Sequence, residues 1–244
     1  MRSPAEDQAA PSGTRVSAGG RPSVAGTRLS TAWNLLIVLV ILAALGTQLV
    51  LVIRGKHVLT EHAQLPPTST RVIRFFSYFT VDSNLLCAFS CASLVLDPVR
   101  DGRIWRVVRL NALVGITVTG LIYVSLLRPI VHLTGVPKLT DIGMHYVAPI
   151  AVVLGWLLFG PRPRLDSATL LASLIFPACY VLYTLAHGAA SHWYPYPFVD
   201  VDALGYPVVL RNGVGVCVLL LGVSVLFSYT DGWLSRRNRP AATR

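Results

Sequence analysis

The stretch that decides the fold is FSYFTVDSNLLCAFSC, residues 76–91, which carries a carboxylate, several hydroxyls and an amide within an apolar part of the chain. A hydrocarbon bilayer offers no water to such groups, so Thr80, Asp82, Ser83 and Asn84 need partners inside the protein. Polar clusters at membrane depth often mark functional sites. The stretch therefore predicts a membrane helix that packs inside a bundle and carries a candidate site.

The composition is that of an integral membrane protein. Hydrophobic residues make up 53% of the chain and charged residues only 13%, against about 25% charged in typical soluble domains. Six apolar windows are long enough to cross a hydrocarbon core about 30 Å thick. The sequence thus predicts an all-α, polytopic bundle of six transmembrane helices, at about residues 32–53, 74–96, 107–127, 142–160, 168–187 and 207–228.

Both ends of the chain differ from this apolar domain. Residues 1–30 are rich in Ala, Gly, Ser, Thr, Pro and Arg, and so few large apolar groups predict a disordered tail. Residues 236–244 form a short basic tail. The membrane domain therefore spans residues 31–235, and its first apolar run is too long for a signal peptide, so we expect it to be retained as an anchor.

The net charge of +10 is explained by orientation. Placing the N-terminus in the cytoplasm puts fourteen of the 21 Lys and Arg residues inside and seven outside. This asymmetry obeys the positive-inside rule and predicts that both termini are cytoplasmic at the cell membrane. We expect the excess charge to contact anionic lipid. Nucleic acid is not an expected partner, because no soluble segment interleaves basic and aromatic residues.

No motif for a cofactor or metal is present. The chain lacks a phosphate-binding loop, a dinucleotide fingerprint, HExxH and GxSxG. Cys87, Cys91, Cys179 and Cys217 all fall within predicted spans without CxxC spacing, so we expect packing residues, no metal and no disulfide framework.

The second predicted span carries one polar stripe. Thr80, Ser83, Asn84, Cys87 and Cys91 follow one another at helical spacing and share a face. Small and polar residues on one face are typical of helix packing in membranes. Two interpretations remain open at this point: the stripe only packs and hydrogen-bonds, or it also carries chemistry.

A histidine in the fourth span supplies a partner for chemistry. Rising about 1.5 Å per residue, Thr80 lies roughly 9 Å below Arg74 and His145 roughly 6 Å below Asp141, so the two side chains reach a similar depth. A threonine hydroxyl becomes a nucleophile when a neutral imidazole takes its proton. Pro149 has no N–H, which favours a kink beside His145. The alternative for His145 is a residue at the membrane interface that reaches toward water.

Other polar groups are predicted at the same outer level. Tyr183 and His187 end the fifth span, and the following loop is rich in aromatics and prolines, which suits a stiff cap or an aromatic belt. Asp82 points away from the Thr80 stripe, and an ion pair with Arg128 or Arg211 is expected for it. We count Asp82, Tyr183 and His187 as supporting or substrate-binding candidates.

Several motifs resemble a known family. YFTVDSN (78–84), HYVAP (145–149) with GWLLF (155–159), and YPYPF (194–198) resemble the bacterial six-span family labelled Pr6Pr, which is similar to the animal androgen-induced-gene membrane proteins. The resemblance covers roughly residues 31–235. Animal members hydrolyse fatty-acid esters of hydroxy fatty acids with a threonine and a histidine, which implies Thr80 as nucleophile and His145 as base.

The expected function is therefore a membrane-embedded hydrolase of lipid-like fatty-acyl esters. Ser83 or Asn84, on the same face as Thr80, is a candidate donor to the developing oxyanion. The alternative is a non-catalytic protein that binds a membrane lipid or transports a small solute. The distance between Thr80 and His145 distinguishes the two, and the sequence leaves the substrate and the oligomeric state open.

Overall fold

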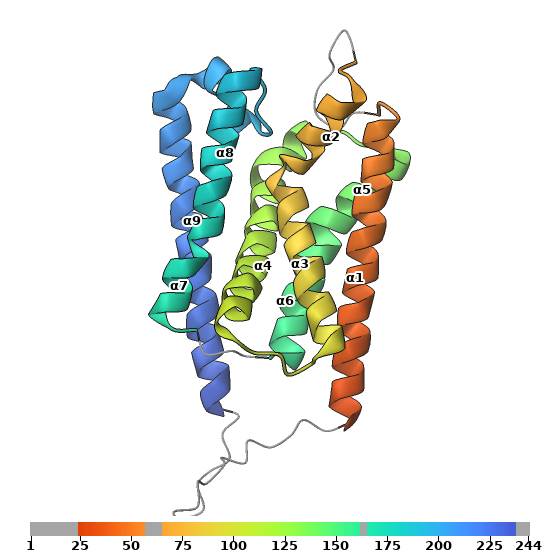
Figure 1. Cartoon of the computed structure of the whole chain (residues 1–244), viewed down its shortest axis with the longest axis vertical. Helices are drawn as coiled ribbons and strands as arrows, with labels where there is room; N and C mark the ends of the chain where they lie inside the picture. The colour runs from red at the N-terminus through yellow and green to blue at the C-terminus, as the bar shows by residue number, and fades with distance from the viewer. Residues whose placement is uncertain (1–23, 57–64, 162–164, 238–244) are drawn as a thin grey trace, which may run out of the picture.

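The chain forms a bundle of long helices. The computed structural model describes residues 24–56, 65–161 and 165–237, and these contain helices and connecting segments but no strand. Six of the helical segments are long and apolar enough to span a membrane, and α1 begins at the same end of the bundle at which α9 finishes (Figure 1). The predicted all-α, six-span architecture is confirmed, with spans at Gly26–Ile53, Phe79–Leu96, Arg103–Ile130, Gly135–Phe159, Ser167–Ser191 and Val201–Arg236.

Four helices surround the core. They are α1 (Val24–Ile53), α3 (Phe79–Leu96), α4 (Arg103–Ile122) and α6 (Ala148–Phe159), and they pack pairwise around buried apolar side chains. The predicted stripe on α3 faces this core, since all five of its residues are buried: Thr80, Ser83, Asn84, Cys87 and Cys91. Small side chains there let α3 lie close to α1 and α4.

Three further helices lie on one side of α4. They are α7 (Ser167–Ser173), α8 (Ile175–Ser191) and α9 (Val201–Arg237), which are seen beside α4 in Figure 1. α7 and α9 contact α4 directly. A short 3₁₀ turn, η4 (Pro197–Val199), lies in the loop between α8 and α9. This loop bends back toward the bundle and delivers aromatic side chains to the site.

The prediction of one continuous helix over residues 74–96 is wrong. The segment is divided into α2 (Thr68–Phe76) and α3, with Ser77 and Tyr78 between them. The backbone groups freed by the break bond to tyrosines: Phe79 N–H donates to the Tyr180 hydroxyl at 3.1 Å, and that hydroxyl donates to the Ser77 carbonyl at 3.1 Å. A break at membrane depth is tolerated because protein groups replace the lost helical partners.

Three further irregular turns interrupt the third and fourth spans. α4 continues into a π-helical turn, η1 (Tyr123–Leu127), and then a 3₁₀ turn, η2 (Arg128–Ile130). α5 (Gly135–Ile142) continues into a second π-helical turn, η3 (Gly143–Val147), directly before Pro149 in α6. The departure from regular helix expected at Pro149 is therefore present, since π turns accommodate a missing backbone donor.

The predicted starts of the first and the fourth spans shift. α1 begins at Val24, within the segment predicted as the N-terminal tail, while residues 1–23 and 238–244 of the two predicted tails lie outside the described residues. The fourth span begins at Gly135, seven residues before the predicted start. Asp141 thus lies inside the helix and is buried, because its carboxylate finds partners there.

Candidate functional site

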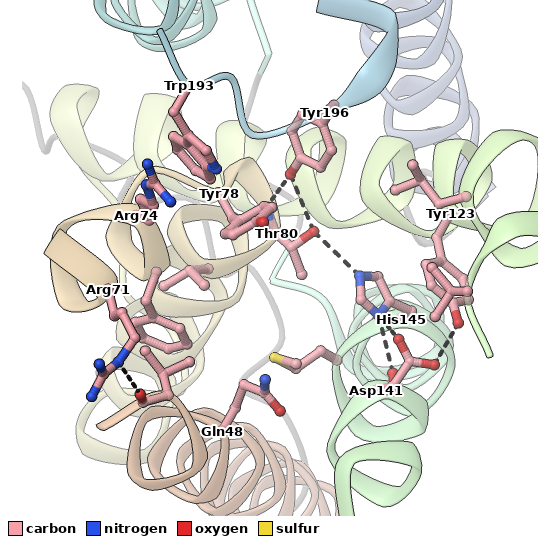
Figure 2. A pocket seen from close by; sticks show the side chains of 16 residues that line it. Gln48, Arg71, Arg74, Tyr78, Thr80, Tyr123, Asp141, His145, Trp193 and Tyr196 are labelled. Carbon is pink, nitrogen blue, oxygen red and sulfur yellow. Dashed lines mark hydrogen bonds and ion pairs between the residues drawn. The ribbon is translucent and has the colours of Figure 1, made fainter. Parts of the chain in front are cut away.

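A cavity opens where the irregular turns meet. Its volume is about 120 Å³, and its walls come from the end of α1, from α2 and α3, from η1 and η3, and from the loop before α9 (Figure 2). Its apolar wall consists of Val52, Phe75, Val81, Leu127, Val131 and Met144, and its polar or aromatic wall of Gln48, Arg71, Arg74, Tyr78, Thr80, Tyr123, Asp141, His145, Trp193 and Tyr196.

Thr80 and His145 meet in this cavity. The Thr80 Oγ1 atom lies 3.3 Å from His145 Nε2, although the two residues are 65 positions apart (Figure 2). Thr80 is the second residue of α3, so it also stands at a helix N-terminus, where unpaired N–H groups and the helix dipole favour negative charge. The two helices that were expected to carry a nucleophile and a base therefore touch at those two residues.

The other side of the imidazole is held by a carboxylate. His145 Nδ1 lies 2.9 Å from Asp141 Oδ1 and 3.1 Å from the Asp141 carbonyl oxygen. The Tyr123 hydroxyl donates to Asp141 Oδ2, and the Tyr123 ring stacks on the imidazole with 4.0 Å between centroids. Two acceptors at Nδ1 assign the ring proton to that nitrogen, which leaves Nε2 free to accept a proton from Thr80.

Tyr196 approaches Thr80 from the loop before α9. Its hydroxyl accepts a hydrogen bond from the Thr80 backbone N–H at 3.2 Å and lies 3.4 Å from Thr80 Oγ1. Burial raises the pKa of the Tyr196 phenol, so the group stays protonated at neutral pH. The sequence pointed only to an aromatic cap here. The signal for this residue was the alternation of Tyr with Pro195 and Pro197.

Ser83 and Asn84 do not line the cavity. The Ser83 hydroxyl donates to the Phe79 carbonyl at 2.7 Å and lies 2.8 Å from Thr119 Oγ1 on α4. The Asn84 amide donates to the carbonyls of Thr80 and Met144. The geometry therefore gives no support to the expected oxyanion role for either side chain. Instead they fasten α3 to α4 and to η3, because each bonds a group on a neighbouring element.

Asp82, Tyr183 and His187 also lie outside the cavity wall. Asp82 is half-buried, and no ion pair with Arg128, Arg211 or any other described residue forms, so the expected ion pair is wrong. Two positions after Thr80, Asp82 is turned roughly 200° around the helix, away from the cavity. The Tyr183 hydroxyl lies 2.6 Å from Ser77 Oγ, so Tyr183 fastens α8 to the break before α3, and the His187 ring stacks on the Tyr183 ring.

Two arginines from α2, Arg71 and Arg74, line the cavity, and the sequence analysis did not include either among the candidate site residues. Arg71 is buried and donates to the carbonyls of Val52 and Ile53, at the C-terminus of α1, at 2.9 and 2.7 Å. The Arg74 guanidinium lies 5.0 Å from the centre of the Trp193 ring, and burial lowers the pKa of Arg74 from its usual value. Among the described residues no group of three or more His, Cys, Asp or Glu side chains could hold a metal.

The fold and these contacts define a multi-pass helical membrane protein with a threonine, a histidine and a carboxylate in one buried chain of contacts. The sequence profile of the family described as FAR-17a/AIG1-like protein matches residues 110–227. This segment is therefore similar to FAR-17a/AIG1-like proteins, which confirms the resemblance to the androgen-induced-gene family. The segment contains Tyr123, Asp141, His145 and Tyr196, whereas Thr80 precedes it. No curated protein and no solved structure matches the chain significantly.

Proposed function

We propose that this protein hydrolyses lipid-like fatty-acyl esters, with Thr80 as nucleophile and His145 as general base. The observation that carries the proposal is the 3.3 Å contact between Thr80 Oγ1 and His145 Nε2, with Asp141 bound to the opposite nitrogen of the same ring. This order of hydroxyl, imidazole and carboxylate is the one by which hydroxyl nucleophiles are activated on unrelated folds. The apolar wall of the cavity suits an acyl chain.

The chemistry proceeds in two balanced halves. His145 Nε2 takes the Thr80 proton as Oγ1 bonds to the ester carbonyl carbon, and the carbonyl electron pair moves to the oxygen. The intermediate then collapses: the bond to the alcohol oxygen breaks, and His145 returns the proton to that oxygen. In the second half, water gives a proton to His145 as its oxygen bonds to the carbonyl carbon of the acyl-threonine. The bond between that carbon and Oγ1 then breaks, the fatty acid leaves, and His145 returns the proton to the Thr80 hydroxyl.

The surroundings of the pair assist both halves. Asp141 holds the imidazole in place and stabilises the imidazolium that forms when the Thr80 proton is taken. The N-terminus of α3 offers a positive dipole end to the negative charge that develops beside Thr80. Both effects are stronger in a cavity that excludes bulk water.

The test is hydrolysis of a chromogenic long-chain ester by the purified protein. Thr80→Ala and His145→Ala should each abolish turnover, and the double variant should be scarcely worse, because residues that act as a unit are not additive. Thr80→Ser should keep part of the activity and remain reactive toward a fluorophosphonate probe, since it retains a hydroxyl. Thr117→Ala is the matched control, because this threonine bonds only within its own helix, to the Leu113 carbonyl.

Two outcomes would contradict the proposal. Full activity in folded Thr80→Ala would remove the nucleophile role. If the wild type hydrolyses no ester at all, the non-catalytic alternative, binding of a membrane lipid or transport of a small solute, becomes the better reading of the cavity.

We also propose that the protein lies in the cell membrane with both termini in the cytoplasm and the cavity toward the outer face. The two-to-one excess of Lys and Arg in the segments on the side of the termini supports this orientation. A reporter fused after Arg239 should be active in the cytoplasm, and one inserted near Ser191 should be active outside. The reverse pattern would overturn the orientation.

A further inference from the structure

We propose that Tyr196 is a catalytic residue whose phenol O–H donates a hydrogen bond to the oxyanion formed on the ester carbonyl bound to Thr80. This inference rests on the proposed hydrolase function and adds to it the group that stabilises the transition state. It replaces Ser83 and Asn84, which do not line the cavity and whose hydrogens are already bonded to backbone carbonyls.

The position of the Tyr196 hydroxyl is the first ground for this role. It lies 3.4 Å from Thr80 Oγ1 and lines the same cavity (Figure 2). Once the carbonyl carbon bonds to Oγ1, the carbonyl oxygen is two bonds from Oγ1. A hydroxyl this close to Oγ1 can therefore reach that oxygen at the distance of about 2.7–3.1 Å that an oxyanion donor needs. His145 approaches Oγ1 as the other polar contact, so base and oxyanion donor reach the nucleophile from separate residues.

The hydrogen-bonding state of Tyr196 is the second ground. Its oxygen accepts the Thr80 backbone N–H, which orients the phenol and leaves its own hydrogen to donate elsewhere. The phenol is buried, and burial raises its pKa, so the hydrogen is retained at neutral pH.

The rigidity of the surrounding loop is the third ground. Pro195 and Pro197 flank Tyr196 and fix their own φ angles. The Tyr196 ring stacks on Phe198, with 5.3 Å between centroids, and meets Tyr78 edge to face at 5.6 Å. A donor held in this way needs little reorganisation when charge develops, which is the condition for strong electrostatic stabilisation.

The step involves a hydrogen bond and no net proton transfer from Tyr196. As the bond from Oγ1 to carbon forms, the carbonyl π pair moves to oxygen, and the Tyr196 O–H shortens its contact with that oxygen. When the carbonyl re-forms and the alcohol leaves with the proton from His145, the contact weakens again. Tyr196 therefore ends each cycle unchanged.

The experiment compares two tyrosines that cap the same helix. Tyr196→Phe should lower kcat by roughly 10²- to 10³-fold with little change in KM. It should weaken the binding of an alkyl trifluoromethyl ketone, which forms an oxyanion adduct with the nucleophile, by a similar factor. Tyr180→Phe is the matched control, since Tyr180 also accepts a backbone N–H in the first turn of α3, is half-buried and does not line the cavity. It should change kcat and the ketone affinity far less.

Two results would overturn the role of Tyr196 while leaving the hydrolase intact: kcat of Tyr196→Phe within about threefold of the wild type, or equal losses in both tyrosine variants. A wild type that hydrolyses no ester would overturn both proposals together. If Tyr196→Phe does not fold, Tyr196→3-fluorotyrosine keeps the shape and makes the phenol more acidic. Activity should then be lost at a lower alkaline pH than in the wild type, and an unchanged pH profile would also contradict the role.

Discussion

The two halves of the bundle differ in how regular their backbone is. The half that contains the cavity holds the break at Ser77 and Tyr78 and both π-helical turns, η1 and η3. In the opposite half α3, α4 and α6 run as regular helices around buried side chains such as Leu94, Leu110 and Val152. Irregular backbone at membrane depth is tolerated only where protein groups satisfy it or it lines a cavity. The irregular half is thus where the sequence can place reactive groups.

The same contrast appears in two buried arginines. Arg71, in the cavity half, donates to the carbonyls of Val52, Ile53 and Pro66 and to the Thr68 hydroxyl. Arg109, in the opposite half, is 2% exposed and donates to Ser90 Oγ at 3.2 Å, while its Nε has no hydrogen-bond partner. No carboxylate in the described part of the chain pairs with either guanidinium. The buried charge of Arg71 satisfies the carbonyls at the C-terminus of α1. The buried charge of Arg109 has fewer partners, so the free-energy cost of its burial is poorly compensated.

The largest expected effect concerns the carboxylate behind the base. Asp141→Asn should lower kcat of ester hydrolysis by roughly 10²- to 10⁴-fold, because an amide neither fixes the tautomer of His145 nor stabilises its cation. The matched control is Asp166→Asn, the same change at the N-cap of α7, where Asn caps a helix about as well as Asp. A kcat of Asp141→Asn equal to that of the control would confine Asp141 to a packing role.

The two arginines provide the next test, which concerns stability. Arg71→Met should destabilise the protein by more than about 3 kcal/mol, because several charge-assisted hydrogen bonds of roughly 1.5 to 3 kcal/mol each are lost. Arg109→Met should be neutral or stabilising, since replacing a poorly compensated buried charge by an apolar group of similar volume often is. The measurement is the melting of both variants in the same detergent. Equal losses would show that the two halves do not differ in this way.

The sequence predicted the features that depend on local pattern. The six spans follow from runs of apolar residues, and the buried stripe from Thr80 to Cys91 follows from helical spacing. The approach of Thr80 to His145 was expected from residue type and depth, although the true starts of both helices differ from the predicted ones. The contact between Thr80 and His145 is therefore explained by the packing of α3 against η3 rather than by the depths calculated from the predicted helix starts.

The features that depend on distant partners were not predicted. The break before α3 is stabilised by Tyr180 and Tyr196, which are more than 100 residues away along the chain, so no local window contains its cause. Asp141 was taken as the residue at which the fourth span enters the membrane, whereas its carboxylate lies inside the bundle and contacts Tyr123 and His145. Charge alone therefore does not locate a helix end when a buried partner is present.

The smallest expected effect concerns Asp82, the charge that led the sequence analysis to expect a buried ion pair. The carboxylate is half-buried, has no ion pair in the described residues and lies in the first turn of α3. Its removal therefore leaves no orphaned cation. Asp82→Asn and Asp82→Ala should each destabilise the protein only by the loss of a carboxylate at a helix N-terminus, roughly 0.3 to 1 kcal/mol.

The measurement for Asp82 is melting of both variants in detergent at low and at high salt. An interaction with the helix end weakens as salt rises, so the difference from the wild type should shrink. A loss of roughly 3 to 5 kcal/mol in Asp82→Ala, unaffected by salt, would instead require a buried cationic partner. In that case Asp82 would be a buried charge with a partner, as Arg71 is, and unlike Arg109.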